Sequence, residues 1–161
     1  APAIYRHFAD KDELMMAVCD RAFLHLDAAL VAAREAAPDP VEALLECASA
    51  YIDFALENPG QYRILFMSKG HEAHEPGSDD PDAWNEMPGM NAFRGLVDAV
   101  QQAVDANLLK AADPQEVAVL LWTGVHGIAS LRISMPDFPW PPLESQRKLL
   151  GDVVISGLAR G

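Results

Sequence analysis

Apolar side chains recur every three or four residues along most of the chain, which is the spacing of one face of an α-helix. The segments with this spacing follow Asp10, Asp39 and Asp113, or cover residues 59–69, 93–104 and 149–158. No β-rich run of alternating polar and apolar residues competes with it, and the sequence contains no hairpin signal. The pattern therefore predicts an all-α protein built from successive helices.

Four of the predicted helices begin at a side chain that can accept hydrogen bonds from the first amides of the helix. These N-cap residues are Asp10, Asp39, Asn58 and Asp113, and proline follows the last three. Proline suits the first helical position because no N–H is needed there. Each N-cap is followed three residues later by Glu or Gln, which can reach back to the cap. We therefore expect four well-defined helix starts.

Two segments are predicted to be loops. Residues 70–82 are polar, acidic and interrupted by Gly and Pro, which indicates a mobile connection. Residues 135–142 contain four prolines and cannot form the interior of a helix. In this second loop we expect Phe138 and Trp140 to hold the connection against the helical body.

The charge balance limits what the chain can bind. It has 12 Lys and Arg against 24 Asp and Glu, a net charge of −12, which is wrong for a protein that wraps DNA electrostatically. A nucleic-acid function must therefore depend on a small local patch or on residues outside this chain. No apolar run approaches the roughly 20 residues needed to cross a bilayer, and no signal peptide is recognisable. Cys19 and Cys47 lie in apolar helical patterns and are expected to be buried thiols. These features indicate a cytoplasmic protein with no membrane contact.

The first fourteen residues differ from the acidic remainder of the chain, because basic and aromatic side chains are interleaved there. The segment resembles the TetR-family signature Leu/Ile-Tyr-x-His-Phe-x-x-Lys-Asp/Glu-x-Leu, which joins the DNA-recognition helix to a long fourth helix. The matching residues are Ile4, Tyr5, His7, Phe8, Lys11, Asp12 and Leu14.

This resemblance implies an all-α, TetR-like helical bundle with a long connecting fourth helix and a C-terminal body that binds a ligand and dimerises. Residues 1–10 would be the end of a helix-turn-helix DNA-binding domain, and residues 11–161 the ligand-binding and dimerisation domain. Tyr5 and His7 would contact DNA, and Lys11 would bind a phosphate with its ammonium group and the first amides of its helix. The base-reading residues are expected to lie outside this chain. The alternative is that Tyr5 and His7 are ordinary surface residues.

A second resemblance lies in residues 122–127, WTGVHG, which are similar to the Trp-x-x-x-His-Gly stretch of one TetR subgroup. Glycine inside a helix costs about 1 kcal/mol relative to alanine, so we expect another helix or a ligand to come close to Gly124 and Gly127. His126 lies one turn after Trp122 and shares its face. Two interpretations of His126 stay open, a core histidine bonded to a backbone carbonyl and a residue of a ligand pocket.

The bulky side chains of the middle helices are candidates for a pocket between bundle helices, although such residues are also typical of an ordinary core. The candidate pocket residues are Tyr51, Phe54, Phe66, Met67, Trp84, Met87, Phe93, Trp122 and His126. By resemblance to the family, the last two helices would pair with those of a second subunit in a four-helix interface. The candidate interface residues are Leu121, Val125, Ile128, Leu149, Val153, Val154 and Gly157.

The two resemblances predict a transcriptional repressor that binds operator DNA as a homodimer and is released by a small, largely apolar effector. No cofactor is expected. His71 and His74 with Glu72 and Glu75 could suggest a metal site, but a solvated run of charges is the simpler interpretation, so no metal is predicted. A helical-bundle carrier or enzyme is the alternative, yet the sequence has no phosphate-binding loop and no nucleophile clustered with a base. We therefore expect no enzymatic activity. A dimerisation scaffold without a ligand is a third hypothesis.

Overall fold

The computed structural model describes residue 8 and residues 10–67, 89–110 and 112–158. These residues form six α-helices and no strand, which confirms the all-α prediction. In chain order the helices are α1 (Lys11–Ala36), α2 (Pro40–Glu57), α3 (Pro59–Phe66), α4 (Met90–Asp105), α5 (Pro114–Ser134) and α6 (Leu143–Leu158). The predicted loop at residues 135–142 connects α5 to α6, whereas the one at residues 70–82 lies outside the described residues.

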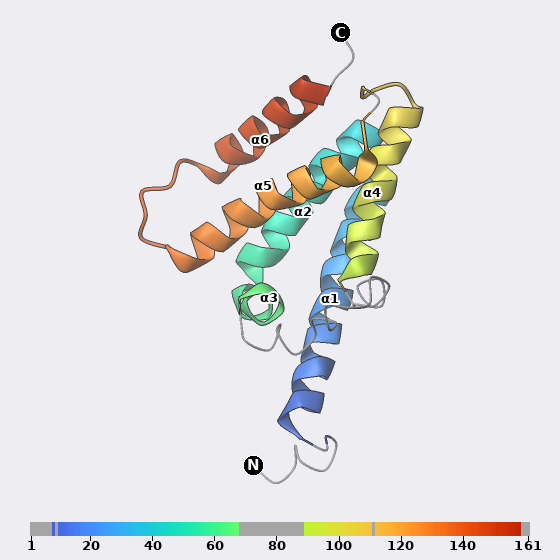
Figure 1. Ribbon diagram of the computed structural model, residues 1–161. Helices are drawn as coiled ribbons and strands as arrows, with labels where there is room; N and C mark the ends of the chain where they lie inside the picture. The colour runs from blue at the N-terminus through green and yellow to red at the C-terminus, as the bar shows by residue number, and fades with distance from the viewer. Residues whose placement is uncertain (1–7, 9, 68–88, 111, 159–161) are drawn as a thin grey trace.

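Helix α1 is the longest element and extends beyond the other helices at its N-terminal end (Figure 1). Its 26 residues correspond to about 39 Å at 1.5 Å per residue. The buried residues Cys19, Ala22 and Leu26 belong to the part that packs on the body, while Met16 and Val18 nearer the start are exposed. This is the long helix that the sequence predicts after Asp10.

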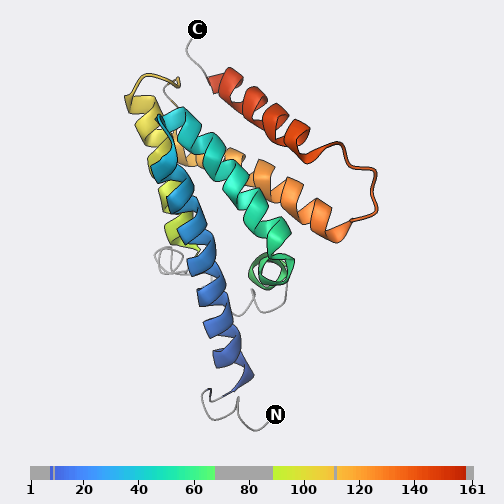
Figure 2. The same cartoon turned by 180° about the vertical axis from the view of Figure 1, so that it is seen from behind.

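Helices α2, α4 and α5 pack on one another and form the body with the C-terminal half of α1. The short helix α3 closes one end of this body by packing on α1 and α2. Helix α6 contacts α2 and α5 and lies on the side of them away from α1 and α4, as the two opposite views show (Figures 1 and 2).

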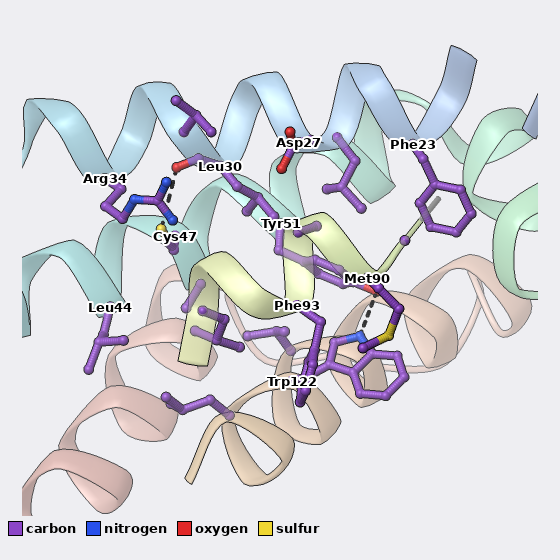
Figure 3. Close-up of a pocket in the computed structure, with 18 of the residues that line it drawn as sticks. Phe23, Asp27, Leu30, Arg34, Leu44, Cys47, Tyr51, Met90, Phe93 and Trp122 are labelled. Atoms are coloured by element: carbon purple, nitrogen blue, oxygen red, sulfur yellow. Dashed lines mark hydrogen bonds between the residues drawn. The ribbon is translucent and has the colours of Figure 1, made fainter. Parts of the chain in front are cut away.

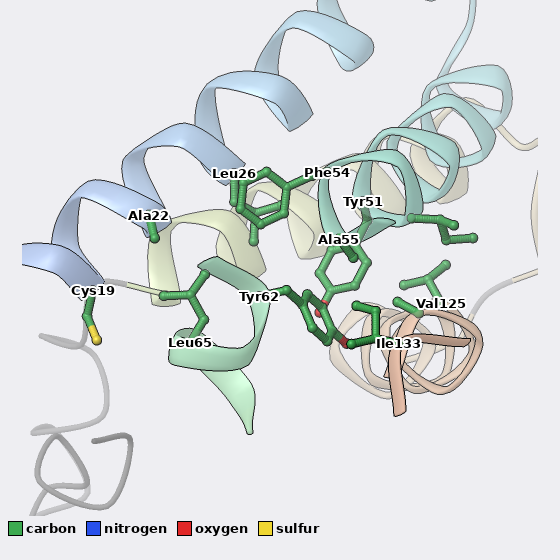
Figure 4. Close-up of a cluster of buried hydrophobic side chains, with 12 residues drawn as sticks. Cys19, Ala22, Leu26, Tyr51, Phe54, Ala55, Tyr62, Leu65, Val125 and Ile133 are labelled. Atoms are coloured by element: carbon green, nitrogen blue, oxygen red, sulfur yellow. The ribbon is translucent and has the colours of Figure 1, made fainter. Parts of the chain in front are cut away.

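Two groups of buried side chains make up the core. The first joins α1, α2, α3 and α5 and includes Leu26, Ile52 and Tyr62 (Figure 4). The second joins α2, α4, α5 and α6 and includes Leu44 and Val100. Burying an apolar side chain of this size contributes about 1.5–3 kcal/mol, so these contacts account for the packing of all six helices.

Three of the four predicted N-caps are confirmed. The carboxylates of Asp10, Asp39 and Asp113 accept hydrogen bonds from the backbone N–H groups two or three residues later. The prediction for Asn58 is wrong, because its side chain does not cap α3. Asn58 is the one residue between α2 and α3, and its Nδ2 instead donates to the carbonyl oxygen of Phe54 at 3.0 Å, at the end of α2.

The contacts that attach α6 to the body include close packing on α5 and an ion pair with α2. A Cβ built at Gly124 would lie 2.8 Å from Cδ1 of Leu150, so the glycine lets the α6 side chain approach α5 as the sequence led us to expect. Near Gly127 such a Cβ would meet no atom of the described chain within 4 Å, so close packing does not explain that glycine. On the other side, the Arg147 guanidinium pairs with the Asp53 carboxylate of α2.

The loop before α6 is held by Trp140. Its indole Nε1 donates to the carbonyl oxygen of Met135 at 2.9 Å, and the Arg132 guanidinium lies 5.5 Å from the ring centroid. The ring of Phe138 contacts that of Trp140 at a tilt of 52°, with centroids 4.5 Å apart, and Phe138 is about half exposed. Trp140 therefore connects the loop to α5, whereas Phe138 covers the loop and faces solvent.

Among the described helices, α5 is the one whose length and apolar composition would allow it to cross a bilayer. This differs from the sequence-based expectation that no segment reaches that length. The core helix of a soluble protein meets the same criterion, and α5 packs Val117, Ala118 and Leu121 into the core formed with α2 and α4. We therefore interpret α5 as a core helix.

Candidate functional site

A cavity of about 300 Å³ lies among α1, α2, α4 and α5, with one side chain from α3 (Figure 3). Small-molecule pockets have volumes of about 300–1,000 Å³ and mostly apolar walls, so this cavity is at the small end of that range. It is lined by Phe23, Leu26, Asp27, Leu30, Val31, Arg34, Leu44, Cys47, Ala48, Tyr51, Phe66, Gly89, Met90, Ala92, Phe93, Leu96, Leu121, Trp122 and Val125.

Helix α1 supplies a continuous wall. Phe23, Asp27, Leu30 and Arg34 are spaced three or four residues apart and therefore share one face of the helix, and all four line the cavity. The wall combines apolar side chains with one carboxylate and one guanidinium. None of these residues is among the pocket residues that the sequence predicts. The spacing of Asp27 and Arg34 within the apolar stripe was the signal that could have found them.

One end of the cavity is aromatic. The rings of Phe93 and Trp122 meet edge to face with centroids 6.1 Å apart, and those of Phe23 and Phe66 do so at 5.9 Å. The indole Nε1 of Trp122 lies 3.4 Å from the Tyr51 hydroxyl, to which it donates (Figure 3). These contacts tie α1, α2, α3, α4 and α5 together around one cavity.

Behind this aromatic wall, His126 connects two buried tyrosines. The hydroxyl of Tyr51 lies 3.0 Å from His126 Nδ1, and that of Tyr62 lies 2.8 Å from the same nitrogen. Figure 4 shows both tyrosines directed toward α5. Burial lowers the pKa of His126 and raises the pKa of Tyr51 to about 12. Burial, and then the neighbouring Tyr51, raise the pKa of Tyr62 as well. All three groups are therefore neutral at pH 7, with Nδ1 assigned as the acceptor.

Four of the candidate pocket residues are brought together in the cavity wall. These are Tyr51, Phe66, Phe93 and Trp122. His126 lies behind the wall, as a core histidine whose partners are tyrosine hydroxyls rather than a single backbone carbonyl.

The remaining candidate pocket residues lie elsewhere. Phe54 is buried in the first core cluster, where its ring meets that of His25 with centroids 5.2 Å apart. Met67 is the residue at which α3 ends, and it is 43% exposed and does not line the cavity. Trp84 and Met87 lie outside the described residues.

The candidate interface residues divide into two groups. Leu149 and Val153 on α6 are 64% and 63% exposed, which leaves their side chains available to a second subunit. Gly157 on the same helix is also exposed, and Ile128 on α5 is half-buried against the core. The other three are buried within their own subunit, because they pack into its core clusters. These are Leu121, Val125 and Val154.

The candidate DNA contacts can be placed only in part. Lys11 is exposed at the first position of α1, whereas Tyr5 and His7 lie outside the described residues. The backbone N–H groups of Asp12 and Glu13 both donate to Asp10 Oδ1 at 2.9 Å. The expectation that Lys11 acts together with these amides is therefore corrected, since the Asp10 carboxylate already occupies them.

The described residues contain no group of three or more His, Cys, Asp or Glu side chains that could hold a metal ion. His71, Glu72, His74 and Glu75, which were considered for that role in the sequence, lie outside the described residues.

Comparisons with known proteins agree with this architecture. Residues 44–150 match the family model of the tetracyclin repressor-like C-terminal domain. A protein of unknown function from Rhodococcus sp. RHA1 is 26% identical, with a TM-score of 0.81 over 96% of this chain and 76% of its own. A TetR family transcription regulator from Marinobacter aquaeolei VT8 is 15% identical, with a TM-score of 0.72 over 98% of this chain and 78% of its own. At 15% identity, the similarity to the Marinobacter aquaeolei protein shows that the two chains share a fold. No curated protein matches the chain.

The fold and the family match define the class of protein, an all-α domain of the kind found in transcription regulators. The chain belongs to the TetR family, through its tetracyclin repressor-like C-terminal domain.

Proposed function

We propose that the protein is a transcriptional repressor that acts in the cytoplasm, binds operator DNA as a homodimer and releases it when a small, largely apolar ligand enters the cavity. In this proposal residues 1–10 are the end of a helix-turn-helix domain, and residues 11–161 are the ligand-binding and dimerisation domain. The family match and the ligand-sized apolar cavity support it.

The observation that carries the proposal is the double role of α1. One of its faces between Phe23 and Arg34 lines the cavity, while its first turn carries Lys11 beyond the packed body (Figure 1). A ligand that separates α1 from α4 would move the start of α1. Half-sites of an operator are about 34 Å apart along DNA, so even a small change in the spacing of two DNA-binding heads weakens binding. Couplings of this kind amount to about 1–3 kcal/mol.

The DNA contact at the start of α1 is a simple electrostatic one. Lys11 offers its ammonium group to a phosphate, and Tyr5 and His7 are proposed to contact DNA beside it. Since Asp10 accepts from the amides of Asp12 and Glu13, the N-terminus of α1 does not add a second anion site there.

The dimer is proposed to form through exposed apolar side chains of α5 and α6. Leu120 and Leu131 on α5 are 55% and 47% exposed, and Leu149 and Val153 on α6 are more exposed still. Exposed apolar residues gathered on neighbouring helices are typical of an interface, and a twofold axis would place them against their own copies.

A gel-shift titration of the full-length protein on its own promoter DNA tests the proposal. A library of small apolar compounds is expected to contain ligands that abolish the shift. The substitution Ala92→Trp fills the cavity from α4 and should make DNA binding indifferent to those ligands, whereas Ala32→Trp on the exposed side of α1 should leave their effect intact. Failure to shift any promoter fragment contradicts the DNA-binding half, and ligands that act equally on Ala92→Trp contradict the role of the cavity.

A further inference from the structure

The cavity wall contains a carboxylate that has no counterpart within the part of the chain that the structure describes. Asp27 lines the cavity from α1 and is half-buried, and none of the described residues forms a hydrogen bond or an ion pair with it (Figure 3). Its neighbours on the same helix face are Phe23, one turn before, and Leu30, almost one turn after. An ionised carboxylate beside apolar walls loses part of its hydration, and a partner of opposite charge compensates for this loss.

The other charged group of the wall is already engaged. Arg34 Nη1 donates to the carbonyl oxygen of Gly95 on α4 at 3.0 Å. A Cβ at position 95 would lie 2.5 Å from that Nη1, so the absence of a side chain at Gly95 is what gives the guanidinium its place. Arg34 therefore joins α1 to α4 at one end of the cavity.

Asp27 and Arg34 do not neutralise each other. Seven residues along a helix correspond to about 10 Å, and no ion pair joins the two side chains. A ligand that enters the cavity thus meets a negative charge on α1 that none of the described residues pairs with, and a positive charge whose guanidinium is bound to α4.

The surrounding rings favour the same kind of ligand. The faces of aromatic rings attract cations, and Phe23, Phe93, Trp122 and Tyr51 all line the cavity. The net charge of −12 adds a long-range attraction for positive molecules. The apolar remainder of the wall requires that most of the ligand be hydrocarbon.

We infer that the effector is a lipophilic organic cation, an ammonium or amidinium group on a compact apolar body, with the Asp27 carboxylate as its counterion. The inference rests on the proposed function, since it names the ligand class of the same cavity. The size of the cavity, about 300 Å³, limits the effector to a molecule of modest size.

Three probes of nearly the same shape and different charge test this inference. Phenylbutylamine is positive at pH 7, phenylbutanol is neutral and phenylbutyrate is negative. Calorimetric titration into the full-length protein is expected to show that the amine binds most tightly, the alcohol less tightly and the carboxylate least tightly. A charge-assisted hydrogen bond contributes enough to change affinity by about 10- to 100-fold, and we expect the amine to exceed the alcohol by this factor.

Two variants of α1 test whether the preference for the positive probe arises at Asp27. Asp27→Asn should lower the affinity for the amine about 10- to 100-fold and leave that for the alcohol unchanged. Asp20→Asn removes the same charge from an exposed position of α1 and should change neither affinity by more than about twofold, which controls for the net charge. Thermal unfolding of both variants verifies that they are folded.

The outcomes separate this inference from the function on which it rests. Binding of the alcohol or the carboxylate as tightly as the amine, or an amine affinity that Asp27→Asn does not change, contradicts the inferred charge and leaves the ligand-binding function standing. Preference for the carboxylate, lost in Arg34→Gln, would assign recognition to Arg34 instead. If none of the three probes binds while a compound of the library abolishes the gel shift, the inferred ligand class is contradicted and the ligand-binding function stands.

Discussion

The hydroxyl of Tyr51 lies 3.0 Å from Nδ1 of His126, and this contact joins the cavity wall on α2 to the core helix α5. Tyr62 of α3 reaches the same nitrogen at 2.8 Å. His126 is therefore the common partner of two buried hydroxyls, and the stability of the domain depends on it more than on an ordinary half-buried histidine.

We predict that His126→Leu destabilises the protein by about 1–3 kcal/mol, because the buried tyrosine hydroxyls lose their contact with Nδ1, while Tyr62 keeps the backbone carbonyl of residue 126 within reach. Urea unfolding of the wild type and the variant measures this difference. Thr123→Ala, at an exposed position of the same helix, is the control and should change the free energy of unfolding by less than about 0.5 kcal/mol. A comparably small change in His126→Leu would contradict the role given to His126.

The same histidine should make stability depend on pH. Burial lowers the pKa of His126 in the folded protein, so below its unfolded value of about 6.5 the unfolded chain binds more protons than the folded one. Stability should therefore fall as the pH decreases through about 6.5 toward the lowered folded pKa, and be independent of this group above about pH 7. His126→Leu lacks this contribution, so the difference in unfolding free energy between wild type and variant should shrink toward pH 5. A difference that stays constant would show that His126 does not titrate in this way.

Leu149→Glu is predicted to weaken dimerisation by at least about tenfold, because it places a charge among apolar side chains at the proposed interface. Sedimentation velocity over a concentration series measures the change. Leu24→Glu makes the same substitution on α1 at a residue that is 69% exposed, and it should leave the dimer intact. Equal behaviour of the two variants would place the interface elsewhere.

Lys11→Gln is predicted to weaken operator binding for all sequences alike and to reduce the slope of log affinity against log salt by about 1, the contribution of one phosphate contact. The measurement is a gel shift at several salt concentrations with the full-length protein. Lys110→Gln removes a lysine from the far end of the domain, where its ammonium donates to the carbonyl oxygen of Gly157 at 3.3 Å, and should leave the slope unchanged. A slope that Lys11→Gln does not alter would remove this residue from the DNA contact.

The starts of the helices were predictable from the sequence where the capping contact is local. Asp39 and its own following residues contain all that the N-cap requires, so the contact forms as the pattern indicates. Asn58 has the same pattern, yet it stands between two helices and its amide serves the end of the first one. A pattern of residues does not reveal which of two adjacent helix ends will take the side chain.

The site was predictable only for its aromatic part. Trp122 and Tyr51 are bulky residues on middle helices, and such residues meet in the interior of a bundle. Asp27 and Arg34 were missed because charged side chains in an amphipathic pattern are ordinarily assigned to the solvent face. Only the packing of α4 against α1 makes their face the wall of a cavity.

The coupling between the cavity and DNA is tested most directly by its reciprocity. The phenylbutyl probe that binds most tightly is titrated calorimetrically into the full-length protein. One titration uses the free protein, and the other uses protein saturated with operator DNA. Thermodynamic linkage requires that operator weaken probe binding by the same factor by which the probe weakens operator binding. We predict a matched factor of about 5- to 150-fold in both experiments. Equal affinity of the probe for free and operator-bound protein would contradict the proposed coupling between the cavity and DNA.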